Sequence, residues 1–358
     1  MPCERCESIH SYKLEGDYEL YIFPPKGHCY SKLTRALKKA GISFREKNPI
    51  ISLTFTKESA TFIGEVFAQT YTSVELDDTK AVLLMAHEKK DFANVLPNTY
   101  SLKKVVGMCA AQWLTAVLED NDLTTYCQPI MGSDDFKPFG FECLLRGFYQ
   151  QKVISPEVLF HAARDSDMLF LLDKKSRVTH INNMSQINLG NRKIFINFNP
   201  TAIYDPQFCL STTNKALKET NILPEQVIFE VTESDEVKDK RHLLNIIHYY
   251  RHQGYGVALD DLGSGYSSLN LLTDLQPDYI KLDGYLVSNI HESQVKQVLI
   301  ENICEMAAKL HIKVICEGIE CQEELDTIKQ YKIDYYQGFL FHKPMLYTDV
   351  EQYLAGCN

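Results

Sequence analysis

Short apolar runs recur along the chain from residue 123 to the C-terminus, and each run ends in a polar residue. These polar residues are Glu142, Asn197, Glu230, Asp260, Lys281, Glu317 and Gln337. Helix-like segments separate most of the runs, which follow one another at intervals of about 20 to 55 residues, the length of one or two strand–helix units. Strands that alternate with helices over about 235 residues predict a parallel sheet, and this length favours a closed (β/α)8 barrel over an open sheet.

In such a barrel the carboxyl ends of the strands share one face, so the seven polar side chains are expected to meet there. A lone Glu or Asp at a strand end is usually a helix cap or a solvated loop residue. Four carboxylates and an amide at one face, however, would concentrate negative charge unless cations lie among them. Cys143 and Cys316 adjoin acidic residues and are therefore expected to face the other side of their strands. Oxygen donors without imidazole or thiolate favour Mg²⁺ or Mn²⁺ over zinc or copper.

Two adjacent aspartates, Asp260 and Asp261, end the apolar run in "ALDDLGSGYSS" at residues 258 to 268. Such a pair can hold two neighbouring cations, with Asp260 as a shared ligand and Asp261 as a separate one. Two hard cations about 4 Å apart are a device for hydrolysing phosphodiesters. Gly263 and Gly265 let the following loop bend sharply and approach a ligand.

Three further polar residues accompany this pair, and each has two interpretations. Lys281 is either a salt-bridge partner of the acids or a cation that orients the attacking water and stabilises charge on a phosphate. Arg146 is either a surface residue or a guanidinium that binds phosphate at the barrel mouth. Gln337 either caps a turn or positions water or Lys281.

Eight motifs in order make the chain from about residue 122 resemble the EAL-domain phosphodiesterases that hydrolyse cyclic di-GMP. The motifs are "CQPI" at 127–130, "FECLLRG" at 141–147, "INFNP" at 196–200, "FEVTES" at 229–234, "ALDDLGSGYSSL" at 258–269, "PDYIKLD" at 277–283, "ICEGIE" at 315–320 and "YYQGFLFHKPM" at 335–345. The resemblance implies an α/β fold, a (β/α)8 TIM-like barrel of the EAL type with one antiparallel strand. It also implies that cyclic di-GMP is opened to linear pGpG, and that two Mg²⁺ or Mn²⁺ ions assist.

The resemblance further assigns roles to individual residues. The expected ligands of the first ion are Glu142, Asn197, Glu230 and Asp260, and those of the second are Asp260, Asp261 and Glu317. Glu142, Lys281, Glu317 and Gln337 are expected to act in catalysis, together with Glu233, which is expected to hold the "DDLGSGYSS" loop in shape. The residues expected to line the substrate are Gln128, Leu144, Arg146, Asp283 and Glu320. The same loop contributes to a dimer interface in the family, so a homodimer is expected.

The N-terminal region carries a different pattern, in which apolar strands and amphipathic helices alternate from residue 18 to about 90. We therefore predict a small α/β regulatory or dimerisation domain over 1–100, a connecting helix over 101–122 and the barrel over 123–358. The alternative is that this domain binds no small molecule and only pairs two chains. "CERC" at residues 3 to 6 has the spacing of a metal or redox pair but lacks a second such pair, so an inert terminus is the alternative there.

Composition narrows the classes of function. The 358 residues include 45% hydrophobic residues, enough for a sizeable core, and the formal net charge of −10 argues against general DNA binding. The sequence contains no long apolar run that could span a bilayer, and its 11 scattered cysteines suit a reducing compartment, so a cytoplasmic location is expected.

Three rival functions remain open on the sequence. A nucleotide receptor or a protein that sequesters a partner would be expected to have lost metal ligands or loop residues, and the sequence keeps them. A different metallohydrolase on the same barrel would not account for the eight motifs.

Overall fold

The computed structural model describes residues 14–232, 239–263 and 268–357 and divides them into two compact units. The first unit comprises residues 14–122 and 147–172, and the second comprises the described residues of 123–146 and 173–357. The boundary is therefore not a single point along the chain, because the segment 147–172 packs with the N-terminal residues.

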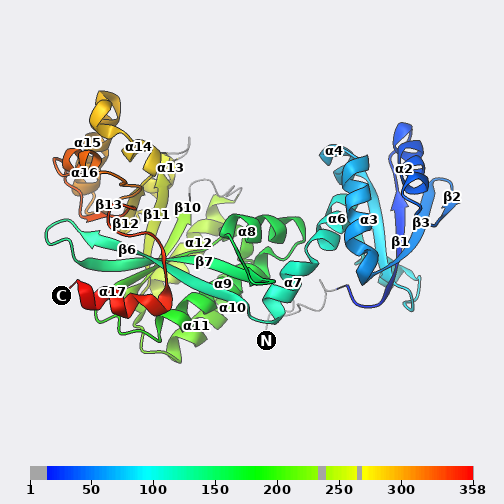
Figure 1. Cartoon of the computed structure of the whole chain (residues 1–358), viewed down its shortest axis with the longest axis horizontal. Coiled ribbons are helices and arrows are strands. Elements are labelled where there is room, and N and C mark those ends of the chain that lie inside the picture. The colour runs from blue at the N-terminus through cyan, green and yellow to red at the C-terminus, as the bar shows by residue number, and fades with distance from the viewer. Residues whose placement is uncertain (1–13, 233–238, 264–267, 358) are drawn as a thin grey trace. The chain divides into compact units, whose positions relative to one another are not determined.

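The N-terminal unit is built on a five-stranded antiparallel sheet with the order β2-β3-β1-β4-β5 (Figure 1). Its strands are β1 (Asp17–Phe23), β2 (Phe44–Lys47), β3 (Ile50–Thr56), β4 (Lys80–Met85) and β5 (Thr99–Ser101). Its helices are α2 (His28–Lys39), α3 (Lys57–Thr70), α4 (Ser73–Asp78), α5 (Phe92–Val95), α6 (Leu102–Ala110) and α7 (Gln112–Glu119). The predicted small α/β domain is thus present, with β1 as the central strand of its sheet.

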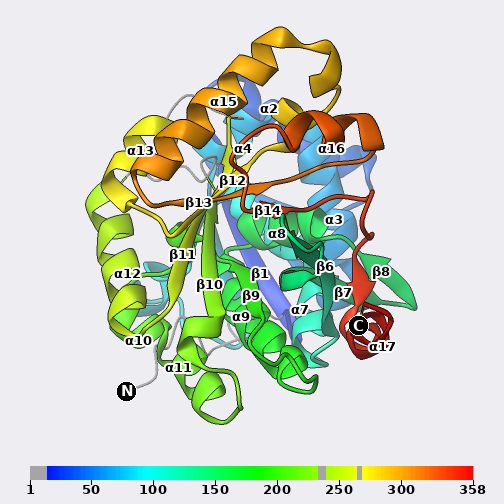
Figure 2. The ribbon, with the colours of Figure 1, turned by 90° about the vertical axis from the view of Figure 1, so that its left-hand side faces the viewer.

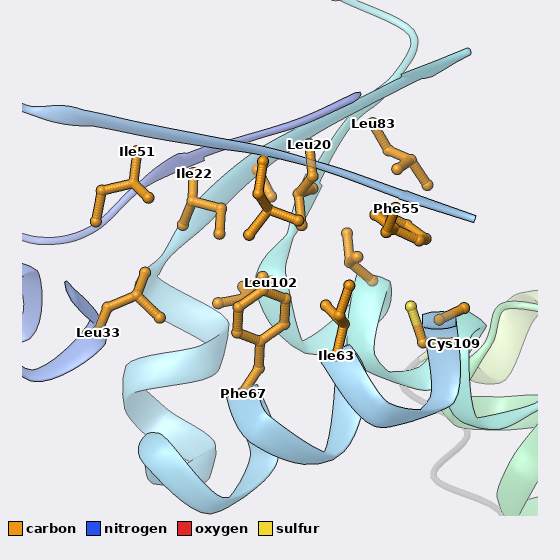
Figure 3. Close-up of a cluster of buried hydrophobic side chains, with 14 of the residues drawn as sticks. Leu20, Ile22, Leu33, Ile51, Phe55, Ile63, Phe67, Leu83, Leu102 and Cys109 are labelled. Carbon is orange, nitrogen blue, oxygen red and sulfur yellow. The ribbon is translucent and has the colours of Figure 1, made fainter. Parts of the chain in front are cut away.

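One face of this sheet is covered by helices, and the space between them is an apolar core. Side chains at every second position of β1 point into it, with Leu20 and Ile22 fully buried. Figure 3 shows Ile63 and Phe67 of α3 pointing toward the sheet from the helix side. This alternation of period two in the strand and of three to four in the helix is the pattern on which the sequence prediction rested.

The predicted connecting helix is two helices, α6 and α7, because Ala111 leaves the helical conformation with φ −94° and ψ 17°. Helix α6 packs closely against α8 (Pro156–Asp165): a Cβ atom added to Gly107 would lie 1.9 Å from the carbonyl oxygen of Asp165. Lys104 also pairs with Asp167 at 2.8 Å. These contacts group residues 147–172 with the N-terminal sheet, and the predicted limits 1–100, 101–122 and 123–358 stay a prediction.

Within the described residues of the second unit and the adjoining end of β7, eight strands close a barrel in the order β6-β14-β13-β12-β11-β10-β9-β7 and back to β6. These strands are β6 (Leu123–Gly132), β7 (Pro138–Tyr149), β9 (Lys193–Asn197), β10 (Val227–Thr232), β11 (Gly256–Leu262), β12 (Tyr279–Leu282), β13 (Lys313–Cys316) and β14 (Tyr335–Tyr336). Strand β6 is antiparallel to β14, whereas the pairings from β7 round to β14 are parallel. The predicted barrel with one antiparallel strand is confirmed.

Helices form the outer layer of the barrel, and α12, α13 and α15 lie outside the strands in Figure 2. The remaining helices are α9 (Leu169–Met184), α10 (Pro206–Cys209), α11 (Ser211–Lys218), α12 (Lys240–His252), α13 (Ser268–Leu275), α14 (Gly284–Val287), α15 (Gln294–Lys309), α16 (Gln322–Ile328) and α17 (Val350–Gly356). Short strands β8 (Lys152–Ile154) and β15 (Met345–Leu346) pair with β7 and β6. Among the described residues, every helix is too short or too polar to cross a membrane.

An apolar layer fills the barrel interior below its carboxyl-end face. It includes Phe195 of β9, Ile228 of β10, Ala258 of β11 and Ile315 of β13, with Tyr279 of β12 packed against them. A predicted site residue follows each of these residues two positions later. It lies in the same strand, except for Glu317, which directly follows β13. Because side chains two apart in a strand share a face, the sequence places an apolar layer and then a polar layer along the barrel axis.

Candidate functional site

The polar layer unites the seven strand-end residues that the sequence singled out. Parallel pairing sets Glu230 beside Asn197, and it sets Asp260 beside Thr232, two residues further along β10. Several strands continue beyond the site residue, since β7 runs on to Tyr149 and β11 to Leu262. The site residues are thus partly within strands, although they share one end of the barrel as predicted.

Lys281 is the centre of this layer. Its ammonium nitrogen lies 2.6 Å from an oxygen of Glu317, 2.7 Å from one of Glu230, 3.1 Å from one of Asp260 and 3.6 Å from one of Glu142. The Lys281 side chain is 1% exposed. Three carboxylates from β7, β10 and β11, and a fourth directly after β13, therefore surround one buried ammonium group.

Two amides connect the carboxylates. The amide nitrogen of Asn197 donates to Glu230 at 3.0 Å and to Glu142 at 3.3 Å. The amide nitrogen of Gln337 donates to the other oxygen of Glu142 at 2.6 Å and to Gln128 at 3.2 Å. Glu142 is thereby held from two sides, which fixes the position of its carboxylate.

Two sets of carboxylate oxygens lie close enough to share a cation. In Glu142, Glu230 and Asp260 the donor atoms lie within 4.8 Å of one another, and the same holds for Asp260, Asp261 and Glu317. Asp260 belongs to both sets. All five residues are hard oxygen donors, which fits Mg²⁺ or Mn²⁺.

Asp261 reaches this face although its neighbour Asp260 already points there. Consecutive strand residues normally face opposite sides, but Asp261 has a φ of +56°, and the pairing of β11 with β12 shifts register between Leu259 and Leu262. Aspartate tolerates the left-handed region better than most residues do, which explains why this residue type can occupy the irregular position.

The cluster holds more carboxylates than its one ammonium group can neutralise. Burial opposes a charge on Lys281, but the attraction of Asp260, Glu142, Glu230 and Glu317 outweighs it and raises the pKa of this lysine. Burial also raises the pKa of Glu230 and of Glu317, against the opposing attraction of Lys281. One ammonium group thus keeps its proton but does not balance all the surrounding carboxylates.

The pKa of Asp261 is raised as well. Burial, followed by the charges of Asp260 and Asp283, raises the pKa of Asp261 to about 6. Cations bound between these carboxylates would relieve the repulsion that otherwise favours their protonated forms.

The five predicted substrate-lining residues lie at different depths. Gln128 is buried and bonded to Gln337, while its own amide nitrogen donates to the carbonyl oxygen of His342 at 3.3 Å. Leu144 and Arg146 share the strand face of Glu142 by alternation along β7. The Arg146 guanidinium lies 5.3 Å from the ring centroid of Tyr126, and it donates to the Leu145 carbonyl oxygen.

Asp283 and Glu320 lie nearer the rim. The carboxylate of Asp283 accepts a bond from Tyr285 N–H at the start of α14, so it caps a helix, and its charge acts on Asp261. Glu320 has an exposed side chain, and its main-chain N–H donates to Glu324. Glu233, predicted to hold the loop after β11, lies outside the described residues.

Two contributors to the site were missed on the sequence. The carbonyl of His342 holds Gln128, and a main-chain acceptor carries no signal in a single sequence. Tyr126, which lies under Arg146, could have been found, because it precedes Gln128 by two positions in β6 and so shares its strand face.

The sequence and the fold both resemble those of known proteins. The sequence profile of the family described as EAL domain matches residues 111–344, more than half of the chain. The Escherichia coli (strain K12) protein named "Probable cyclic di-GMP phosphodiesterase PdeG" is 28% identical over 248 residues, covering 66% of this chain and 47% of that protein. The chain thus spans about half the length of this curated relative.

Two solved structures share the fold. The c-di-GMP-bound form of a standalone versatile EAL protein from Vibrio cholerae O395 has a TM-score of 0.57 and 35% identity, covering 63% of this chain and 93% of that chain. The manganese/cy-diGMP complex of Klebsiella pneumoniae BlrP1 has a TM-score of 0.58 and 22% identity, covering 92% of this chain and 97% of that chain. The second likeness supports the fold alone, and it extends over nearly the whole chain.

Proposed function

Because the chain belongs to the EAL domain family, we propose that it hydrolyses cyclic di-GMP to linear pGpG. The observation that carries the proposal is the pair of oxygen-donor sets that share Asp260 beside the buried Lys281. The similar structure from Vibrio cholerae O395 is a c-di-GMP-bound form, and that of Klebsiella pneumoniae BlrP1 is a complex with manganese and cy-diGMP.

Two Mg²⁺ or Mn²⁺ ions fit the donor sets, with Glu142, Asn197, Glu230 and Asp260 holding the first and Asp260, Asp261 and Glu317 the second. The fit rests on the all-oxygen donors and on the acid excess around Lys281. Bound there, the ions would acidify a water and neutralise the phosphate that it attacks. The amide nitrogen of Asn197 donates hydrogen bonds to Glu142 and Glu230 in this structure. Because only the amide oxygen can bind a cation, the Asn197 amide would have to turn over to serve as a ligand.

The side chains of the protein place the attacking water. Lys281 supplies ammonium donors at the centre of the cluster, where charge develops on the phosphate. The amide oxygen of Gln337 is buried, and no donor in the described residues reaches it, so it is available to accept a hydrogen bond from that water. Arg146 has the planar fork of donors that suits a phosphate oxygen pair.

Asp260→Asn tests the chemistry, with Asp326→Asn as the matched control. The Asp326→Asn substitution removes the same charge, and the Asp326 side chain in α16 is 63% exposed. We expect Asp260→Asn to lower metal-dependent pGpG formation by about 100- to 1,000-fold or more, while Asp326→Asn keeps the parent rate. Chromatography of the products, with a chelator control, measures both. Tight nucleotide binding without product in the parent protein would instead support a receptor.

We further propose that the N-terminal unit regulates this reaction and that the protein is a homodimer. Strand β7 supports the regulatory proposal, because it carries Glu142 in the barrel and continues into Gly147–Tyr149, which belong to the other unit. A shift of the segment 147–172 could therefore move Glu142 along its own strand. The homodimer proposal rests on the resemblance of the sequence "DDLGSGYSS" to the loop that contributes to a dimer interface in the family.

Gly107→Ala tests regulation without touching the barrel. The added Cβ collides with the Asp165 carbonyl and must separate α6 from α8, whereas at Gly356 an added Cβ meets nothing within 4 Å. We expect Gly107→Ala to change kcat for cyclic di-GMP and Gly356→Ala to leave it unchanged. An unaltered kcat in a Gly107→Ala protein whose α6 amides exchange faster would count against regulation through this contact.

A further inference from the structure

A second group of metal-type ligands belongs to the N-terminal unit, whereas the carboxylate cluster belongs to the barrel. His28 and Cys29 occupy the first turn of α2, and Glu75 lies in the first turn of α4. Their donor atoms converge within 4.8 Å of one another. We propose that His28, Cys29 and Glu75 bind one divalent transition-metal ion of the Zn²⁺ class.

The spacing of the donor atoms matches a tetrahedral site. His28 Nε2 lies 3.0 Å from Glu75 Oε1 and 3.7 Å from Cys29 Sγ, and the Cys29 sulfur lies 3.8 Å from the same Glu75 oxygen. Ordinary bond lengths from zinc to nitrogen, sulfur and oxygen at tetrahedral angles place such atoms about 3.4 to 3.6 Å apart. Shifts of a few tenths of an ångström would therefore complete three corners of the tetrahedron.

Glu75 is oriented so that one oxygen is left for the metal. Its Oε2 accepts from Lys32 Nζ at 2.7 Å and from Thr72 N–H at 2.7 Å, which leaves Oε1 facing His28 and Cys29. A carboxylate whose second oxygen is anchored by hydrogen bonds is the usual arrangement around a bound metal.

The donor types select the class of ion. Imidazole, thiolate and carboxylate together suit Zn²⁺ or Co²⁺, whereas the barrel offers only oxygen donors and suits Mg²⁺ or Mn²⁺. The His28 side chain is 78% exposed, so the fourth corner is open to water. The Cys29 thiol is buried, and on metal binding its proton passes to solvent. The charge of Lys32 works against a cation, so the site is expected to be weaker than a closed four-ligand zinc site.

Cobalt is the probe, because a thiolate bound to Co²⁺ gives a charge-transfer absorption that oxygen ligands do not give. The protein, stripped of metal and carrying Cys3→Ala and Cys6→Ala to remove the CERC pair, is titrated with Co²⁺. We expect one equivalent to produce the band and Zn²⁺ to abolish it by displacement. Absence of the band at saturating Co²⁺ overturns the proposal.

Matched variants assign the band to the cluster. Cys29→Ala is expected to remove it and Cys109→Ala to keep it, since Cys109 is a buried thiol of the same hydrophobic core that belongs to no ligand group in the described residues. His28→Ala changes an exposed side chain and is expected to weaken Co²⁺ binding more than about 100-fold. Asp260→Asn in the barrel is expected to keep the band. A band that survives Cys29→Ala, or that is insensitive to His28→Ala in a folded protein, contradicts the proposal.

Discussion

The two units bury their interiors in opposite ways. The core between the N-terminal sheet and its helices is made of apolar side chains such as Leu20 and Phe67, and it gains stability from every methylene that leaves water (Figure 3). The polar layer of the barrel buries Lys281 and Glu230 just as deeply, at 1% and 0% side-chain exposure. Buried charge costs stability unless it is paired, so the barrel gives up stability for a site that can hold cations.

The first prediction tests how strongly the barrel depends on its buried ammonium. Lys281→Met leaves four carboxylates without their shared cation, so we expect the free energy of unfolding of the barrel to fall by about 3 to 5 kcal/mol in the presence of a chelator. Native-state hydrogen exchange of β10 to β13 measures this loss separately from the other unit.

Lys313→Met is the matched control for that change. Lys313 pairs with Asp334 at 2.6 Å, but its side chain is 56% exposed, so the same substitution is expected to cost only about 0 to 1 kcal/mol. Equal losses in the two variants would mean that the buried cluster is no more demanding than a surface ion pair.

The second prediction applies to the apolar side of the comparison. Phe67→Ala opens a cavity in the N-terminal core and is expected to lower the free energy of unfolding of that unit by about 3 to 5 kcal/mol. Phe62 lies on the same helix with 50% exposure, and Phe62→Ala is expected to change stability by no more than about 0.5 kcal/mol. Urea denaturation of both variants checks the difference, and a Phe67→Ala protein as stable as the parent would contradict the assigned core.

These two interiors also explain what the sequence could predict. The barrel was predictable because apolar runs that lead to a polar residue recur along the chain, and Ile228 and Glu230 of β10 are one example. The long strands and helices of the N-terminal unit were predictable from their periodicity. Strand β2 was missed because its sequence, "FREK", is nearly all exposed and lacks apolar alternation.

Other features depend on distance along the chain or on backbone geometry. The packing of residues 147–172 with the N-terminal unit relies on the close approach at Gly107, which no local pattern indicates. Asp261 was expected in the site by family resemblance, whereas its ability to face the same side as Asp260 comes from a φ of +56° that periodicity would not predict. The ligand group of His28, Cys29 and Glu75 joins two helices and was likewise missed.

The third prediction uses a ligand in place of a mutation. If cations relieve the acid excess, Mg²⁺ at about 100 times its dissociation constant should stabilise the barrel by about 2.7 kcal/mol. The N-terminal core, which has no need of a hard cation, should not respond. Hydrogen exchange in each unit with Mg²⁺ and with a chelator measures the contrast. Asp260→Asn should abolish most of the gain, and equal protection of both units would point to a general salt effect.

The fourth prediction concerns a buried polar group that is kept neutral. His180 of α9 bonds through Nδ1 to the Thr125 hydroxyl at 2.8 Å and through Nε2 to Ser176 at 3.2 Å, and burial lowers the pKa of His180 to about 3. Between pH 6.5 and 3 the unfolded chain therefore binds a proton at His180 that the folded chain does not bind. Stability from this residue is complete above pH 6.5 and is lost as the pH falls.

His180→Gln removes that proton uptake. From pH 7 to pH 5 the parent barrel should lose about 2 kcal/mol more stability than the variant, at about 1.4 kcal/mol for each pH unit below 6.5. Urea unfolding at several pH values gives the slopes. Lys281 keeps its charge because carboxylates surround it, whereas within the described residues the His180 ring bonds to the hydroxyls of Thr125 and Ser176 and to no carboxylate. An unchanged slope in His180→Gln would show that those hydroxyls do not exclude the charge.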